Sequence, residues 1–390
     1  ALLLATSPWL VVFNRKVWQI ALVPVLTLVF VGFVISALVE GRRWHLAWAL
    51  VAYALLVQVH PSAISLALAL VLWFVVFRRQ VCAGPLALGI VLGMATTIPF
   101  LIYQVQEGWP LLAALQAMPE AVTDLEAVRL AAKAITGSDI HALAGKAYPL
   151  LEIVPQLAPT FHLALLLTLG ALAMLAWRAF RNWKAAHARQ RRAARVDLVL
   201  ITWLLIPVLF NVRHSLELHL HSFALIVPAA YLIAGRGIDA LASGGLQYPS
   251  FRRVMRIAGL ATVSWLVASQ IVALVLMARF VANHDTPGGF GRPLGQYLTA
   301  ANRAVEAVKA GVATEVLVVG EGDLPATDAT PAIFDLLLRG RAPYRFLEGS
   351  STAVFPPNPA VALMSPDSGD GAGLYDSWPA EALPGGYRLV

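Results

Sequence analysis

Long apolar runs fill most of the first 280 residues and constrain the fold more than any other feature. They lie at 17–38, 44–59, 61–77, 81–103, 161–177, 198–212, 219–234 and 257–280. A hydrocarbon core about 30 Å thick takes roughly 20 helical residues to cross, so the runs predict about eight spans. Several runs are shorter, and for the two that meet at His60 and Pro61 a re-entrant hairpin is the alternative. The sequence predicts a mainly α, polytopic membrane helical bundle.

The composition also indicates a membrane protein. Hydrophobic residues make up 59% of the chain, charged residues 13%, and the mean hydropathy is +0.71. The formal net charge of +7 does not require a nucleic-acid partner, because the basic residues gather at the ends of apolar runs. Cys82 is the only cysteine, so neither an internal disulfide nor a cysteine-based metal cluster is expected.

The basic residues in the connections between runs predict an orientation. One set of alternate connections carries most of them, namely Arg42, Arg43, Arg78, Arg79, Arg178, Arg181, Lys184, Arg189, Arg191, Arg192, Arg195, Arg236, Arg252, Arg253 and Arg256. The opposite set holds only Arg129, Lys133, Lys146 and Arg213. Because basic connections stay in the cytoplasm, we expect a multi-pass protein of the cell membrane whose opposite connections lie outside. The N-terminal segment, the loop 104–160, the corner 213–221 and the C-terminal tail then share the outer face.

The composition changes after Phe280, where glycine and proline become frequent. The pattern predicts helices at 294–309 and 330–338 and strands at 315–319, 344–347 and 361–364. We therefore divide the chain into a transmembrane domain, 1–280, and a small extracytoplasmic α/β cap domain, 281–390. The outer loop 104–160 has helical composition at 111–118 and 125–135.

Two further features concern what the chain lacks. The turn Gly320-Glu321-Gly322-Asp323 follows a strand but has no third glycine, so nucleotide binding is rejected. The chain opens on Ala-Leu-Leu-Leu-Ala without a charged leader, which is typical of a span that is ending. We expect one or more earlier spans upstream of Ala1.

The first candidate residues are Arg15 and Lys16, which follow Ser7-Pro8-Trp9 just before a span. They could be interfacial anchors, with Trp9 and Trp18 at headgroup level and the cations extended toward lipid headgroups. The alternative is that Arg15 binds a phosphate through its bidentate guanidinium. Two cations on the predicted outer side oppose the charge bias, which favours the functional interpretation.

The second candidate is His60, in the turn Gln58-x-His60-Pro61. Pro61 is explained as the breaker between two apolar runs. His60 is either solvated at the membrane boundary or donates a hydrogen bond to a phosphate or a sugar hydroxyl.

The third candidate group is the corner from Arg213 to His221. If this corner is helical, 100° per residue places His214, Glu217 and His221 within about 60° of one another and turns His219 away. Ionisable groups at membrane depth usually mark function. The alternatives are a solvated helix start with Glu217 near the positive end of the dipole, and a divalent-metal site, although no metal or other cofactor is assigned.

Taken together, these segments resemble the GT-C superfamily of membrane glycosyltransferases, in particular its protein-mannosyltransferase-like and aminoarabinose-transferase-like branch. The resemblance lies in the Ser-Pro-Trp segment followed by Arg15, the Gln-x-His-Pro turn, the Glu-x-x-x-His corner and the outer α/β domain. It implies inverting transfer of a sugar from a polyprenyl-phosphate donor to a hydroxyl of a lipid, glycan or protein acceptor. It also implies a catalytic Asp or Glu in the first outer loop, upstream of Ala1, so no catalytic residue is assigned here.

The leading hypothesis is therefore a lipid-phosphate-dependent glycosyltransferase. Its predicted substrate- and lipid-phosphate-binding residues are Arg15, Lys16, His60, Arg213, His214, Glu217 and His221. Arg15 and Arg213 are expected to contact the phosphate, while His60, Glu217 and His221 shape the cavity. A transporter or flippase with a polar outer gate is one alternative, and a non-catalytic membrane scaffold with an outer recognition domain is another.

Overall fold

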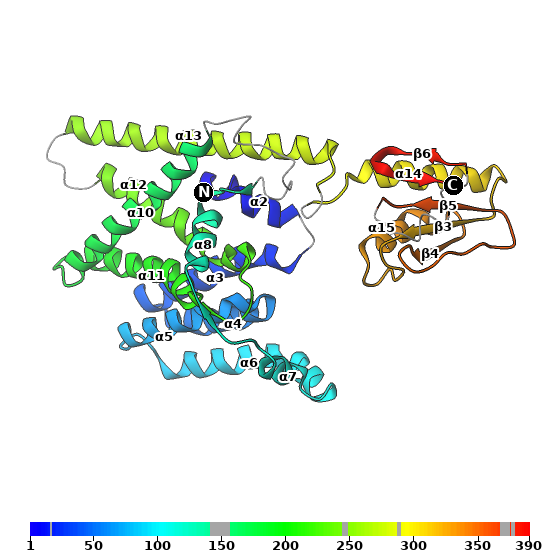
Figure 1. Ribbon diagram of the computed structural model, residues 1–390. Coiled ribbons are helices and arrows are strands. Elements are labelled where there is room, and N and C mark those ends of the chain that lie inside the picture. Colours follow the sequence, from blue (N-terminus) through cyan, green and yellow to red (C-terminus); the bar gives the residue numbers. More distant parts are fainter. Residues whose placement is uncertain (16–17, 141–156, 244–248, 287–289, 367–374, 376–378) are drawn as a thin grey trace. The chain divides into compact units, whose positions relative to one another are not determined.

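The computed structural model describes residues 1–15, 18–140, 157–243, 249–286, 290–366, 375 and 379–390 (Figure 1). The chain forms two compact units. Among the described residues, the helical unit comprises 1–140 and those between 157 and 275, and the cap unit comprises those from 276 to 390. The protein is mainly helical, with a small sheet region at the C-terminal end.

The helical unit consists of α-helices joined by short 3-10 and π segments. Its α-helices are α1 Leu2–Ala5, α2 Pro8–Arg15, α3 Val23–Val34, α4 His45–Val59, α5 Leu66–Val76, α6 Ala83–Gln106, α7 Pro110–Gln116, α8 Glu126–Thr136, α10 Leu157–Asn182, α11 Ala188–Phe210, α12 Val227–Ser243 and α13 Pro249–Asn283, which continues into the cap unit. The shorter segments are η1 Gln19–Leu22, η2 Ile35–Val39, η3 Pro61–Ser65 and η5 Leu220–Ile226.

Six helical segments of the described chain are long and apolar enough to cross a membrane. They are Gln19–Val39, Ala83–Gln106, Leu157–Asn182, Ala188–Phe210, Leu220–Leu241 and Arg253–Asn283. Two more apolar helices, His45–Val59 and Pro61–Val76, are shorter. At 1.5 Å per residue each is several ångströms short of a core about 30 Å thick. These two helices meet at His60, where the sequence analysis gave a re-entrant hairpin as the alternative to two full spans.

The helices pack in two groups. One group contains α3, α4 and α6, and close approach of α6 to α4 depends on glycine, because a Cβ on Gly89 would lie 2.8 Å from the Cα of Ala47. The other group contains α10, α11 and α12 (Figure 1). The carboxylate of Asp197 on α11 ties this second group together, because it is fully buried and bonded to Arg178 of α10 and Arg236 of α12. Removal of one partner from a buried ion pair typically costs about 3–5 kcal/mol.

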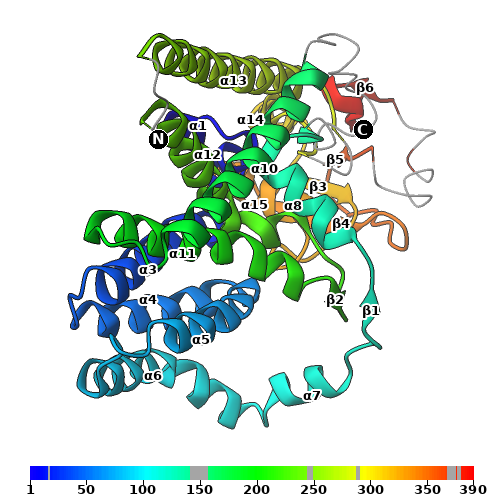
Figure 2. The same cartoon turned by 90° about the vertical axis from the view of Figure 1, so that its left-hand side faces the viewer.

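The connection after α6 extends away from the bundle and returns to it (Figure 2). It passes through α7 and the strand β1 Val122–Thr123, which pairs antiparallel with β2 Arg213–His214. It then forms α8, whose apolar face is buried against η5, α10 and α11 while Arg129 remains exposed. Helices α7 and α8 confirm the helical composition predicted at 111–118 and 125–135; residues 141–156 of the loop lie outside the described chain.

The cap unit contains a five-stranded sheet in the order β4-β3-β5-β7-β6. Strands β3 Glu315–Gly320, β4 Tyr344–Glu348 and β5 Ala360–Met364 are parallel, while β7 Arg388–Leu389 and β6 Glu381–Ala382 are antiparallel additions. Helices α14 Leu294–Lys309 and α15 Ala329–Leu338 cover one face through residues such as Ala304 and Phe334. The five elements predicted for this part of the sequence are all confirmed.

The turn after β3 is occupied by the protein's own carboxylate. The backbone N–H of Gly322 donates to Oε2 of Glu348 at 2.5 Å, and the N–H of Leu324 donates to Asp328 at 2.9 Å. Hydrogen bonds from the hydroxyl and the backbone N–H of Ser350, and then the one from Gly322, hold the pKa of Glu348 below its usual value. An anionic turn whose amides already have acceptors does not suit a phosphate, in keeping with the rejection of nucleotide binding from the sequence.

Candidate functional site

Three histidines and a tryptophan meet in the helical unit. The ring centroids of His60 and His221 are 5.5 Å apart in an edge-to-face arrangement, and His219 stacks on His221 at 5.1 Å. Trp18 approaches His221 edge-on at 4.9 Å. We call His60, His219, His221 and Trp18 the imidazole cluster. It joins η1, η3 and η5, three segments that are far apart in the sequence and each begin a helical run.

Ser62 holds the His60 side chain at the junction of α4 and η3. Its backbone is extended, because a residue before proline is driven out of the helical region, and this ends α4. Its Nδ1 accepts the backbone N–H of Ser62 at 3.2 Å and lies 2.7 Å from the Ser62 hydroxyl. Burial lowers the pKa of His60, so the imidazole is neutral at pH 7. A neutral ring with one nitrogen engaged can offer the other to a hydroxyl or an ester oxygen.

The corner 213–221 is not the helix that the sequence analysis expected. Arg213 and His214 form β2, and the helical segment η5 begins only at Leu220. The prediction that His214, Glu217 and His221 share a helical face is therefore wrong, as is the prediction that His219 points away. His219 is extended, so the 219–221 backbone departs from the 100° rotation that the prediction assumed. Pairing of β2 with β1 competes with helix formation in this segment.

His214 belongs to a different contact. Its Nδ1 lies 2.8 Å from the carbonyl oxygen of Leu216, and its Nε2 lies 3.3 Å from Oδ1 of Asp124. The pKa of Asp124 is lowered, mainly by the backbone N–H of Glu126 and then by His214. His214 thus fastens the corner to the outer loop. Arg213 and Glu217 are exposed, and no described residue forms an ion pair with either side chain.

The segment before the first span docks on the outer loop. Trp9 is 5% exposed, and its indole N–H donates to the carbonyl oxygen of Ser138 at 3.0 Å. Pro8 lies against Gly137, where a Cβ would come within 2.7 Å of the proline ring. The interpretation of Trp9 as an interfacial anchor is therefore wrong. Its indole is a packing element that holds α2 to the end of α8.

Arg15 ends α2 and lies at the rim of an apolar groove. The groove has a volume of about 430 Å³ and lies between α1, α2 and α3. Its walls include Leu10, Val25 and Leu28, while the Arg15 side chain is exposed. Phe13 of α2 contacts Trp18 at 6.3 Å between ring centroids, which connects this helix to the imidazole cluster. Lys16 lies outside the described residues.

Both basic residues in the described part of the outer loop are already paired. Arg129 forms an ion pair with Glu126, and Lys133 forms one with Asp139. Gln58 donates to Thr96 of α6 at 2.8 Å, which makes it a helix-packing residue. Across the described chain, no group of three His, Cys, Asp or Glu side chains is arranged to hold a metal ion.

The structure thus brings together only part of the predicted set. His60 and His221 meet, whereas His214 contacts Asp124 and Glu217 stays apart. Arg15 is on the same helix as Phe13, which contacts Trp18 of the cluster. Sequence reasoning missed Trp18 and His219 as cluster members and Asp124 as a partner of His214. Asp124 and His214 are 90 positions apart, and no local pattern signals such a contact.

Comparisons with protein families, with curated proteins and with solved structures find no match to this chain. The function must therefore be argued from the site.

Proposed function

We propose that this protein is a membrane glycosyltransferase that uses a polyprenyl-phosphate sugar as donor, as its resemblance to the GT-C superfamily implies. The observation that carries the proposal is an apolar groove with Arg15 at its rim, on a helix that contacts the imidazole cluster. An apolar groove suits a prenyl chain, a guanidinium suits a phosphate, and the neutral imidazole of His60 suits a sugar hydroxyl.

The proposal places these groups on the outer face of the cell membrane. In the proposal, α4 and the η3–α5 segment form a pair that enters the membrane from the cytoplasmic side and returns to that side. Whether the pair crosses fully, giving eight spans, or turns back as a hairpin, Arg42 and Arg78 stay on the same cytoplasmic side. The outer loop and the cap unit are then extracytoplasmic in both cases.

Residue roles follow from exposure and charge. Arg15 and Arg213 are exposed cations and bind the donor phosphate. Lys16, the next residue in the sequence after Arg15, is proposed as a further phosphate ligand. His60 and His221 bind sugar or acceptor hydroxyls, and Glu217 lines the entrance. The proposal assigns the catalytic base to none of these residues. The acceptor is a lipid, a glycan or a protein hydroxyl.

A transporter would place ionisable groups along a wet path through the bundle. The buried carboxylate of Asp197 is instead bonded to two arginines, with distances of 2.6 Å to Arg178 and to Arg236. This pairing supports a structural role for Asp197 and favours the transferase over the transporter.

The test is transfer of radiolabelled sugar from a panel of polyprenyl-phosphate donors by the full-length protein in proteoliposomes. We expect Arg15→Gln and Arg213→Gln each to weaken transfer by about 1.5–3 kcal/mol, the range for a hydrogen bond to a charged group. Arg129→Gln is the matched control, because Arg129 is an exposed cation of the outer loop that is paired with Glu126. Wild-type rates in both test variants, or an equal loss in the control, would rule out the phosphate assignment.

A further inference from the structure

A second cavity lies at the other end of the helical unit. It has a volume of about 710 Å³, within the range of ~300–1,000 Å³ found for small-molecule sites. It is formed by the end of α5, the last turns of α10 and the facing part of α11. Ile201, the lining residue on α11 that is nearest to the β2 corner, lies about 14 Å before the end of that helix, and no residue of the imidazole cluster lines the cavity.

The walls of the cavity are apolar. Val76, Leu198 and Ile201 line it, and Trp183 closes one side through a ring contact with Phe77 at 6.3 Å. Phe180 at its mouth is 81% exposed, so its ring is open to contact with an acyl chain.

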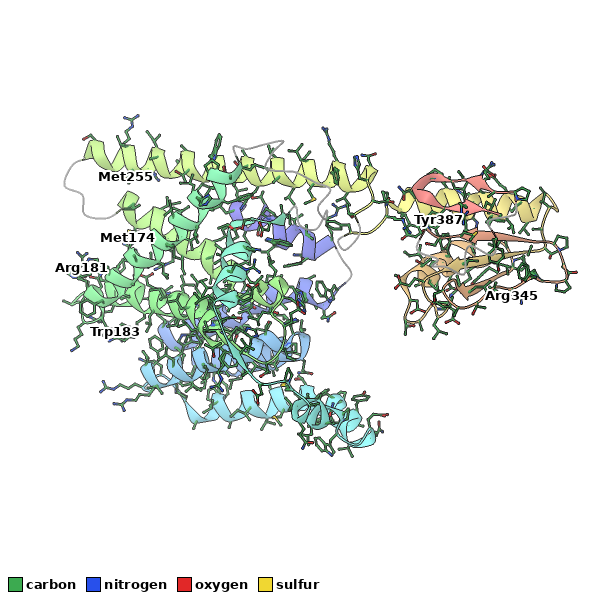
Figure 3. All side chains as sticks on the ribbon, in the orientation of Figure 1. Met174, Arg181, Trp183, Met255, Arg345 and Tyr387 are labelled. Carbon is green, nitrogen blue, oxygen red and sulfur yellow. The ribbon has the colours of Figure 1, made fainter. Side chains whose placement is uncertain are left out.

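Two cations lie at the same cavity. Arg181 is in the last turn of α10, and Lys184 follows two residues after the helix ends. Figure 3 shows Arg181 and Trp183 at the same end of the bundle. Both cations are exposed, and within the described chain neither forms an ion pair with a carboxylate.

The neighbouring arginines behave differently. Arg178 and Arg236 are bonded to Asp197, and Arg192 is bonded to Glu40. The negative end of the α10 dipole accounts for a cation in the last turn, but not for Lys184 beyond it. An apolar cavity with two adjacent unneutralised cations has the charge and polarity that complement an anionic amphiphile.

We propose that this cavity binds one anionic phospholipid of the surrounding membrane. The acyl chain lies along Val76, Leu198 and Ile201, and the phosphate lies between Arg181 and Lys184. Trp183 lies at the level of the headgroup, the depth that indoles prefer in membranes. This site does not depend on the proposed transferase activity, because it shares no residue with the imidazole cluster or with the Arg15 groove.

The experiment measures lipid retention by native mass spectrometry of the purified full-length protein. Phosphatidylglycerol and phosphatidylcholine with the same acyl chains are added in equal amounts. We expect the wild type to bind phosphatidylglycerol preferentially. Arg181→Gln and Lys184→Gln should each weaken its binding about fivefold, and together about 25-fold, while phosphatidylcholine binding stays unchanged.

Two control variants test whether lipid binding depends on this cavity. The first tests surface charge in general, and the second tests the apolar interior of the cavity. The variant with Arg43→Gln and Arg189→Gln loses the same charge from exposed positions that do not line the cavity, and should bind phosphatidylglycerol as the wild type does. Ala176→Phe fills the cavity from an exposed position and should weaken binding of both lipids. Equal affinity of the wild type for the two lipids, or an equal loss in the charge control, would overturn the proposal.

Discussion

At the scale of single residues, the charge state of the imidazoles decides what the cluster can bind. Sequence reasoning named His60 as a hydrogen-bond donor for a phosphate or a hydroxyl. Burial lowers its pKa, and its Nδ1 is engaged by Ser62. A neutral imidazole is a weak phosphate ligand but a good partner for a hydroxyl, so the phosphate role passes to the arginines.

The lowered pKa of His60 predicts that the stability of the protein depends on pH. Because its pKa is lower in the folded state, the unfolded chain binds more protons below pH 6.5. The stabilising contribution is complete above pH 6.5 and is lost as the pH falls toward the folded pKa. The slope for one proton is at most about 1.4 kcal/mol per pH unit.

The measurement compares unfolding of the wild type and His60→Asn in detergent from pH 7.5 to pH 5. Asparagine can still cap η3, so the variant removes the titrating ring and keeps the turn. We expect the wild type to lose more stability than the variant across this range. Parallel pH curves would show that His60 does not titrate differently in the folded state.

At the scale of elements, the described part of the outer loop is fastened to the helical unit at two places. Pairing of β1 with β2 and the contact of Asp124 with His214 hold its middle, while Gly137 and Ser138 receive Pro8 and Trp9. The sequence analysis predicted α8 from its pattern. It could not predict the docking of α2, because that contact joins positions about 130 residues apart.

Gly137 is the sharpest test of this docking. It has a φ of +78° at the end of α8, and a Cβ there would overlap Pro8. Gly108 is a matched control, with a φ of +70° and no atom within 4 Å of an added Cβ.

We expect Gly108→Ala to cost about 1 kcal/mol for the backbone conformation alone. Gly137→Ala should cost about 1–3 kcal/mol more, because overpacking adds to the backbone term. Unfolding in detergent measures the difference, and hydrogen exchange of α2 should accelerate only in Gly137→Ala. Equal losses in the two variants would mean that α2 does not rest on Gly137.

At the scale of the whole molecule, the charge pattern predicts which side of the membrane each unit occupies. Cys82, the only cysteine, precedes α6 next to the basic connection at Arg78 and Arg79. Ser350 is an exposed residue of the cap unit. A membrane-impermeant maleimide should label Cys82 only in inverted vesicles, where the cytoplasmic face is accessible.

The variant with Cys82→Ser and Ser350→Cys should be labelled in intact cells. Denatured samples control for buried thiols in both proteins. Labelling of the two cysteines from the same side would contradict the orientation and, with it, the outer location of the cap unit.

Much of the fold follows from local patterns. The long apolar helices, the elements of the cap and the helices of the outer loop were predictable, because hydropathy over 18 or more residues and strand alternation are properties of contiguous sequence. The conformation of the corner 213–221 was not predictable, because pairing of β2 with β1 overrides the helical pattern of this segment. The site was predicted only in part for the same reason.

The apolar runs and the break after Phe280 predict a mainly helical protein that has segments long enough to cross a membrane and a C-terminal sheet region, because each is a property of neighbouring residues. Packing of distant segments decides the rest. It brings His60 to His221, turns His214 to Asp124, buries Trp9 and surrounds Asp197 with two arginines. These contacts depend on how helices pack against one another in space, and the spacing of residues along the sequence does not specify that packing.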